Sequence, residues 1–223
     1  ISLGKPSIIA FNSKFEGNQI DIKESKPFID TIKKAGNVIF PVVFQQEYLN
    51  LLEATKKSYK TSNFNTNIPL EAIIRHHMNT LLNKNSLELR DKLKKFSLYI
   101  PNEDLFTTFS YHAVLEYLNF SPLSLELLNN CRSIGAINVA SDEDGIIRTA
   151  IPFISYNKNL YPSLAMAIAT EFFTNNKNLK FQSNGDLKFG NKVLPISNEG
   201  NILINWKAKA GSYQHYRISD LIT

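Results

Sequence analysis

Two apolar, β-branched runs separated by an acidic turn sequence constrain the fold of this chain most strongly. They span residues 134–139 and 146–154, and Asp144-Gly145 stands between them. Glycine takes the positive φ that a tight turn requires, so the pattern predicts a β-hairpin. Pro162 follows and predicts that a helix begins there, because a missing N–H is tolerated in the first helical turn.

The first forty residues predict a βαβ unit. Residues 6–12 have the pattern of a short buried strand, and residues 24–36 that of a helix with Pro27 near its start and Gly36 at its end. Residues 37–44 are almost wholly apolar, which indicates a strand that is covered on both faces. The expected fold class is α/β, with α+β as an alternative. Its expected architecture is a layered sandwich in which helices flank a central mixed β-sheet.

An α-rich insertion is expected at about residues 46–120. Residues 46–70 are polar and predict a surface loop or a poorly ordered segment. Over residues 69–96 apolar side chains recur every three or four positions and predict a helix. Further helices are predicted over residues 102–118 and 121–132.

The last fifty residues predict short strands. Apolar stretches at residues 179–181, 187–190 and 192–196 are separated by Asn-Gly and Gly-Asn pairs, which are strong turn signals. Residues 200–206 predict one more strand, which carries the only tryptophan. A single domain is expected over residues 1–223.

Composition and charge argue against nucleic acid as a partner. The formal net charge is +5, but the lysines are scattered along the chain instead of gathering on one face with aromatic residues between them. The longest apolar stretch, residues 38–44, is of strand length and contains a proline, so no membrane-spanning segment is predicted. Ile1 is not a natural start residue, and the chain is therefore expected to be a fragment of a longer protein.

No metal site or catalytic motif is predicted. His76 and His77 are adjacent, so on a helix their rings point in different directions and do not converge on one ion. None of the four histidines belongs to a recognisable catalytic motif. The sequence also lacks a nucleophile elbow, a phosphate-binding loop and a dinucleotide-binding fingerprint. The single cysteine, Cys131, lies in a leucine-rich segment and is expected to be a buried, inert thiol. We expect no cofactor and no enzyme in this fragment.

Asp142, Glu143 and Asp144 form an acidic cluster beside Gly145. The downstream bidentate acid of a calcium loop is missing, which favours a turn whose carboxylates accept backbone N–H groups. Three roles are open for Arg148, which follows the turn: exposure to solvent, a bidentate bridge to Asp142 or Asp144, and contact with an anionic ligand. The spacing favours the bridge.

Several of these segments together resemble the CHASE sensory domains of the second type. Residues 135–153 and 161–165 resemble the central signature of that family. Residues 7–12 with 36–41 resemble its early strand–helix–strand section, and residues 195–206 with 216–221 resemble its closing strands. Because the family usually opens with a further strand and helix, the chain is expected to lack that first unit.

The resemblance implies the extracytoplasmic input domain, periplasmic or extracellular, of a bacterial transmembrane receptor. Such a domain would regulate a cytoplasmic adenylate or guanylate cyclase, histidine kinase, diguanylate cyclase or serine/threonine kinase. The membrane would be reached only through transmembrane helices outside this fragment, and the parent protein can itself be a cyclase or kinase. The signal would be a small molecule or a protein that the family does not specify, and a homodimer of the parent receptor stays open.

We expect a ligand site near the acidic turn and the start of the following helix, whose N–H groups suit an anion. Its candidate residues are Asp142, Asp144, Arg148, Tyr161 and Ser163. Two other functions stay open: a periplasmic solute-binding or adhesion domain without signalling output, and an enzyme of unrecognised type.

Overall fold

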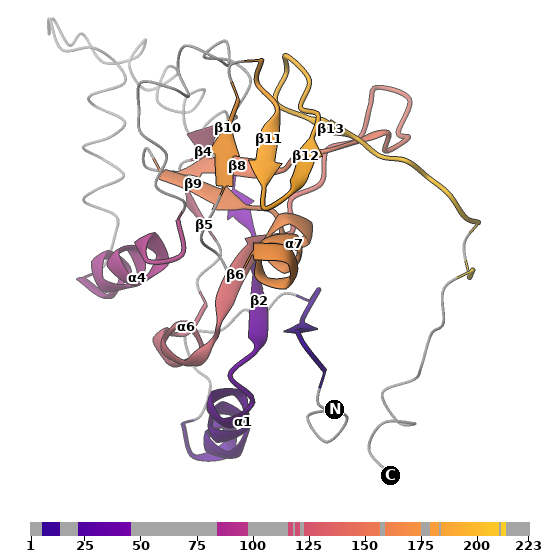
Figure 1. Ribbon diagram of the computed structural model, residues 1–223. Coiled ribbons are helices and arrows are strands. Elements are labelled where there is room, and N and C mark those ends of the chain that lie inside the picture. Colours follow the sequence, from indigo (N-terminus) through magenta and orange to yellow (C-terminus); the bar gives the residue numbers. More distant parts are fainter. Residues whose placement is uncertain are drawn as a thin grey trace, which may run out of the picture.

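The computed structural model of the 223-residue chain mixes helices with short strands, which confirms the expected α/β class (Figure 1). It describes residues 6–13, 22–45, 84–97, 116–117, 119–120, 123–156, 159–174, 179–182, 184–209 and 211–212. The described helices are α1 (Ile22–Ala35), α4 (Lys84–Lys94), α6 (Leu125–Asn130) and α7 (Leu164–Thr174). The strands are β1 (Ile9–Ala10), β2 (Val38–Val42), β3 (Phe44–Gln45), β4 (Glu116–Tyr117), β5 (Asn119–Phe120), β6 (Ser133–Ala136), β7 (Thr149–Ala150), β8 (Phe153–Tyr156), β9 (Asn159–Pro162), β10 (Leu179–Phe181), β11 (Leu187–Phe189), β12 (Lys192–Leu194) and β13 (Ile202–Leu203).

The predicted βαβ unit is confirmed. Strand β1 pairs in parallel with β2, and α1 lies between them in the chain. Gly36 ends α1 with a φ of 67°, and its N–H donates to the Ile32 carbonyl. Every residue of β2 is buried, as its apolar sequence predicts, and β2 also pairs in parallel with β6. These three strands form the sheet β1–β2–β6.

The predicted β-hairpin is wrong in its strand pairing. The turn at Gly145 exists, but β6 pairs with β2, β7 with β13, and β8 with β4 and β9. The reason is burial: β6 is buried at all four residues, and pairing with the covered strand β2 keeps its apolar side chains from water. A two-stranded hairpin at the surface would leave one face exposed.

The C-terminal predictions hold for three strands and partly for the fourth. Strands β10, β11 and β12 form an antiparallel meander, with turns at the predicted Asn184-Gly185 and Gly190-Asn191 pairs. The strand expected over residues 200–206 is confirmed only as β13, which pairs antiparallel with β7.

The α-rich insertion is confirmed in part. Helix α4 lies within the predicted helix 69–96, but the earlier turns of that helix, with His76 and His77, lie outside the described residues. The helix predicted over residues 102–118 is wrong at its end, where β4 forms and pairs with β8, and its earlier part is outside the description. The helix expected over residues 121–132 is α6, which Ser124 caps by accepting the Leu127 N–H.

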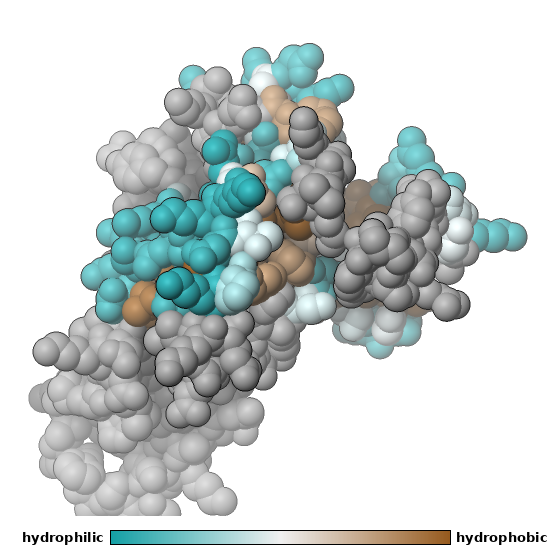
Figure 2. All heavy atoms as spheres, turned by 90° about the horizontal axis from the view of Figure 1, so that it is seen from below, coloured by the Kyte–Doolittle hydropathy of each residue, from teal (hydrophilic) through white to brown (hydrophobic). Residues whose placement is uncertain are grey.

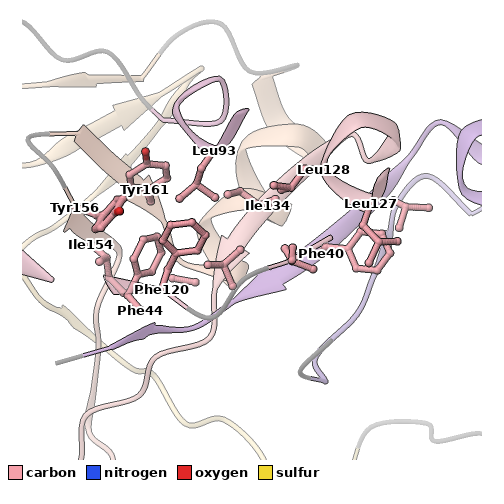
Figure 3. Packing of buried hydrophobic residues seen from close by; sticks show 14 of the residues in the cluster. Phe40, Phe44, Leu93, Phe120, Leu127, Leu128, Ile134, Ile154, Tyr156 and Tyr161 are labelled. Carbon is pink, nitrogen blue, oxygen red and sulfur yellow. The ribbon is translucent and has the colours of Figure 1, made fainter. Parts of the chain in front are cut away.

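The main core packs α1, α4 and α6 against the sheet and an aromatic cluster (Figure 3). In that cluster Phe44 lies 5.3 Å from Tyr161 and 5.7 Å from Tyr156, measured between ring centroids. Helix α1 buries Ile32 and exposes Lys33 and Lys34. Seen from below, at the α1 end, the described surface is mostly hydrophilic (Figure 2).

Helix α7 lies directly on β6 and β2 (Figure 1). A Cβ added to Gly135 would overlap the Cα of Leu164 and lie 2.8 Å from its backbone N, so the contact requires glycine. Glu171 of α7, which is buried, accepts a hydrogen bond of 3.0 Å from Arg132 Nε, just before β6. On its other side α7 contributes Met166 to a second core cluster with Phe153, Leu160 and Leu187.

Candidate functional site

The candidate site is carried by an arm, which we define as residues 137–150 together with 201–206. The arm leaves the end of β6, where the Ile137 N–H donates to the Val42 carbonyl at 3.0 Å. The Asn138 side chain then accepts from the Phe44 N–H at 2.9 Å and donates to the Phe44 carbonyl at 2.6 Å. One amide side chain thus binds both backbone groups of Phe44, as a neighbouring strand would, and fixes the base of the arm.

The tip of the arm is a tight turn. The Gly145 N–H donates to the Asp142 carbonyl at 2.8 Å, the Asp142 N–H donates to the Ile146 carbonyl at 3.0 Å, and Gly145 has a φ of 79°. Asp144 Oδ1 accepts from the Ile146 N–H at 3.1 Å. A carboxylate that accepts a backbone N–H two residues later is the predicted turn, which is confirmed in preference to a calcium loop.

Arg148 forms the predicted bridge across the tip. Its Nη1 donates to Asp142 Oδ2 at 2.7 Å and to Asp144 Oδ1 at 2.9 Å, while Nη2 donates to Asp144 Oδ2 at 2.8 Å. Asp144 is therefore held by both of its oxygens in the bidentate geometry that a guanidinium favours. With Glu143 included, the tip carries three carboxylates and one guanidinium, so it keeps an excess of negative charge. A positively charged group suits this surface better than an anion.

The bridge shifts the pKa values of Asp144 and Arg148. The Arg148 hydrogen bond, helped by the Ile146 N–H, lowers the pKa of Asp144 below its ordinary value of 3.8. The two carboxylates raise the pKa of Arg148, with Asp144 as the larger cause. The pKa of Asp144 is lower in the folded chain than in the unfolded chain. Its contribution to stability is therefore fully present at a pH above the unfolded-state pKa, and it is lost as the pH falls through the folded-state pKa. Both groups are exposed, so solvent screens this contribution.

The second side of the arm comes from residues fifty or more positions later in the chain. Ile202 pairs with Ala150 and Leu203 with Thr149, and the Ile204 N–H donates to the Arg148 carbonyl at 2.9 Å. Trp206 Nε1 donates to the Ile147 carbonyl at 3.0 Å. The sequence patterns did not indicate the roles of Asn138 and Trp206, although Trp206 is the only tryptophan and is the last residue of the strand predicted over residues 200–206.

The structure brings Asp142, Asp144 and Arg148 together but places the other two candidate residues elsewhere. The Tyr161 ring is 2% exposed and packs in the aromatic core, where burial raises the pKa of its hydroxyl (Figure 3). Ser163 caps α7, since its Oγ accepts from the Met166 N–H at 3.3 Å. Pro162 is the last residue of β9, so the helix begins two residues later than predicted.

Metal and thiol chemistry find no support in the part of the chain that the structure describes. There, no group of three or more His, Cys, Asp or Glu side chains is placed to hold a metal ion. Burial raises the pKa of the Cys131 thiol to about 12, so almost none of it is the reactive thiolate at neutral pH. The prediction of an inert thiol is supported, although Cys131 is only partly buried.

Comparison with known protein families decides the assignment. The family model of the CHASE2 domain matches residues 1–223. This chain belongs to the CHASE2 family. Searches of curated proteins and of solved structures gave no match.

The CHASE2 domain is an extracytoplasmic sensory domain of the CHASE type, which is found in cyclases and histidine kinases. It is a sensory module and not a catalytic one. Among the described residues of this CHASE2 domain, no helix has the length and apolar character needed to cross a bilayer.

Replacing Arg148 by methionine should raise the pKa of Asp144 towards 3.8, because the hydrogen bond that most lowers it is lost. The measurement is the pH dependence of the Asp144 carboxyl ¹³C chemical shift. Lys192→Met, which removes an exposed lysine from β12, is the control and should leave the titration of Asp144 unchanged. An identical Asp144 titration in Arg148→Met and the unchanged chain would show that the bridge does not form in solution.

Proposed function

We propose that this chain is the extracytoplasmic signal-input domain of a bacterial transmembrane receptor, whose cytoplasmic output is an adenylate or guanylate cyclase, a histidine kinase or a diguanylate cyclase. The observation that carries the proposal is the CHASE2 match over residues 1–223. Under this proposal residues 1–223 act as one sensory domain, and transmembrane helices beyond them connect it to the output.

The arm is the proposed place where the signal is read. Its tip is exposed, charged and fixed in shape by Arg148, whereas its base is hydrogen-bonded to β3 and continues into β6. A ligand or protein partner that prefers one arrangement of the arm would therefore act on the sheet. Such a signal must bind two arrangements with different affinity, since equal affinity shifts no population.

A hydrogen bond connects the segment that directly follows the arm to the start of α7. Past β7, the Pro152 carbonyl accepts from the Ser163 N–H at 2.8 Å, and Ser163 caps the helix. Within the proposed function, Asp142, Asp144 and Arg148 contact the signal, while Ser163 and the buried Tyr161 pass its effect to the core. The acidic tip favours a cationic group on the signal molecule or partner.

The proposed location can be tested by cysteine labelling of the full-length parent protein in intact cells. Glu143→Cys places a thiol at the exposed tip, and a membrane-impermeant maleimide should label it without lysis. The unchanged parent protein measures background labelling. Burial raises the pKa of Cys131 to about 12, so its thiolate fraction at neutral pH is about a thousandfold below that of an ordinary thiol, and it should react slowly. Labelling of Glu143→Cys only after lysis would place the domain in the cytoplasm and contradict the proposal.

Signalling through the arm can be tested with Arg148→Ala in the full-length receptor. Without the guanidinium the tip carboxylates repel one another and the turn loses its fixed shape, so output should change several-fold. The measurement is cyclic nucleotide formation or autophosphorylation in membrane vesicles, with Lys192→Met as the control that should retain normal output.

Normal output in Arg148→Ala would remove the tip from the signal site. A parent protein without any output domain would favour the alternative function, a periplasmic solute-binding or adhesion domain.

A further inference from the structure

The arm exposes an unusual share of apolar side chains. Five of the nine large hydrophobic residues that are exposed among the described ones lie on it: Val139 (69% exposed), Ile146 (52%), Ile147 (36%), Leu203 (77%) and Trp206 (68%). They come from both sides of the arm and surround an ordered, hydrogen-bonded ribbon, not a frayed end. A concentration of exposed apolar groups on one ordered element marks an interaction surface.

The backbone of the arm also has room for a partner. Within the described part of the chain, β7 and β13 pair only with each other, which leaves an outer edge on each strand. An isolated two-stranded ribbon is marginal in water, and open strand edges are the usual place where a second chain adds. The arm is therefore suited to bind a polypeptide.

The charges of the arm indicate which polypeptide. The tip carries Asp142, Glu143 and Asp144 against the single cation Arg148. Lys207 and Lys209 stand one and three positions after Trp206 and are exposed, and among the described residues neither forms an ion pair with these carboxylates. The same end of the arm thus presents the tip carboxylates and these two lysines, which form no ion pair with each other among the described residues. A surface with both charges is complementary to a copy of itself turned by a two-fold rotation.

We propose that the arm is a homodimer interface, in which exposed apolar side chains of two arms pack against each other and the acidic tip of each lies towards Lys207 and Lys209 of the other. Trp206 and Leu203, which are 68% and 77% exposed, would become buried in this interface, and tryptophan is among the side chains that contribute most to affinity. This inference does not depend on the receptor assignment: it concerns the partner of the arm and holds whatever the output domain is.

The test uses the only tryptophan of the chain as a reporter. Between about 1 and 100 μM, sedimentation velocity of the 223-residue chain should show conversion of monomer into dimer. The emission of Trp206 should move to shorter wavelength over the same range, because its 68% exposed ring becomes buried. A chain that stays monomeric at 100 μM, or a dimer that forms without any change in Trp206 emission, overturns the proposal.

Two variants locate the interface. Leu203→Glu should raise the Kd of the dimer at least about 30-fold, because the interface would then bury a carboxylate where it now buries an apolar side chain. Lys209→Glu should raise it less, and the effect should shrink at high salt. Neither change should unfold the chain, since Leu203 and Lys209 are exposed. Circular dichroism at monomer concentrations checks this.

Val193→Glu is the matched control, because Val193 is 49% exposed on β12, outside the arm. It should leave the Kd unchanged. Dimerisation that survives Leu203→Glu, or that Val193→Glu weakens equally, overturns the arm as the interface.

Discussion

The contact between Gly135 of β6 and Leu164 of α7 is the constraint on which the rest of the described fold depends. The backbones of the strand and the helix touch at this contact, and a Cβ on residue 135 would overlap the backbone of Leu164. The close approach lets α7 cover β6 and β2 while its other side packs on β11. The ion pair between Arg132 and Glu171 stabilises the same docking from the far end of the helix.

The arm follows from this arrangement. Strand β6 ends at Ala136, which also forms a parallel bridge with Ser163, and the chain then enters the arm, where Asn138 fixes its direction by binding Phe44. From that base the arm extends away from the core (Figure 1). It carries the charged tip and exposed apolar side chains such as Leu203 and Trp206. A rigid platform with an ordered, exposed extension is an arrangement in which binding outside the core can act on the sheet. This agrees with a sensory family.

Sequence patterns predicted the local features well. The apolar run of β2, the glycine that ends α1 and the Asn-Gly turns each depend on neighbouring residues, and all three are as expected. The Arg148 bridge was also predictable, because its partners stand four and six positions away. The CHASE2 family was recognisable from the segment around the same turn.

What the sequence did not predict are the partners of strands and side chains that lie far apart in the chain. An apolar, β-branched run indicates a strand at 134–139, but not that it pairs with β2 almost a hundred residues earlier instead of with its neighbour. The hydrogen bonds of Asn138 to Phe44 and of Trp206 to Ile147 span 94 and 59 positions. Tyr161 was predicted as a residue of the ligand site, yet its side chain is buried in the core.

The most direct test of the role of Gly135 is the free energy of unfolding of Gly135→Ala, measured by chemical denaturation. Gly36→Ala is the matched control: Gly36 has a φ of 67° but open space around a Cβ, so the substitution should cost only about 1 kcal/mol of backbone strain. We expect Gly135→Ala to lose about 3 kcal/mol, since α7 must move away from β6. A loss no larger than that of Gly36→Ala would show that α7 does not dock on β6 at this contact.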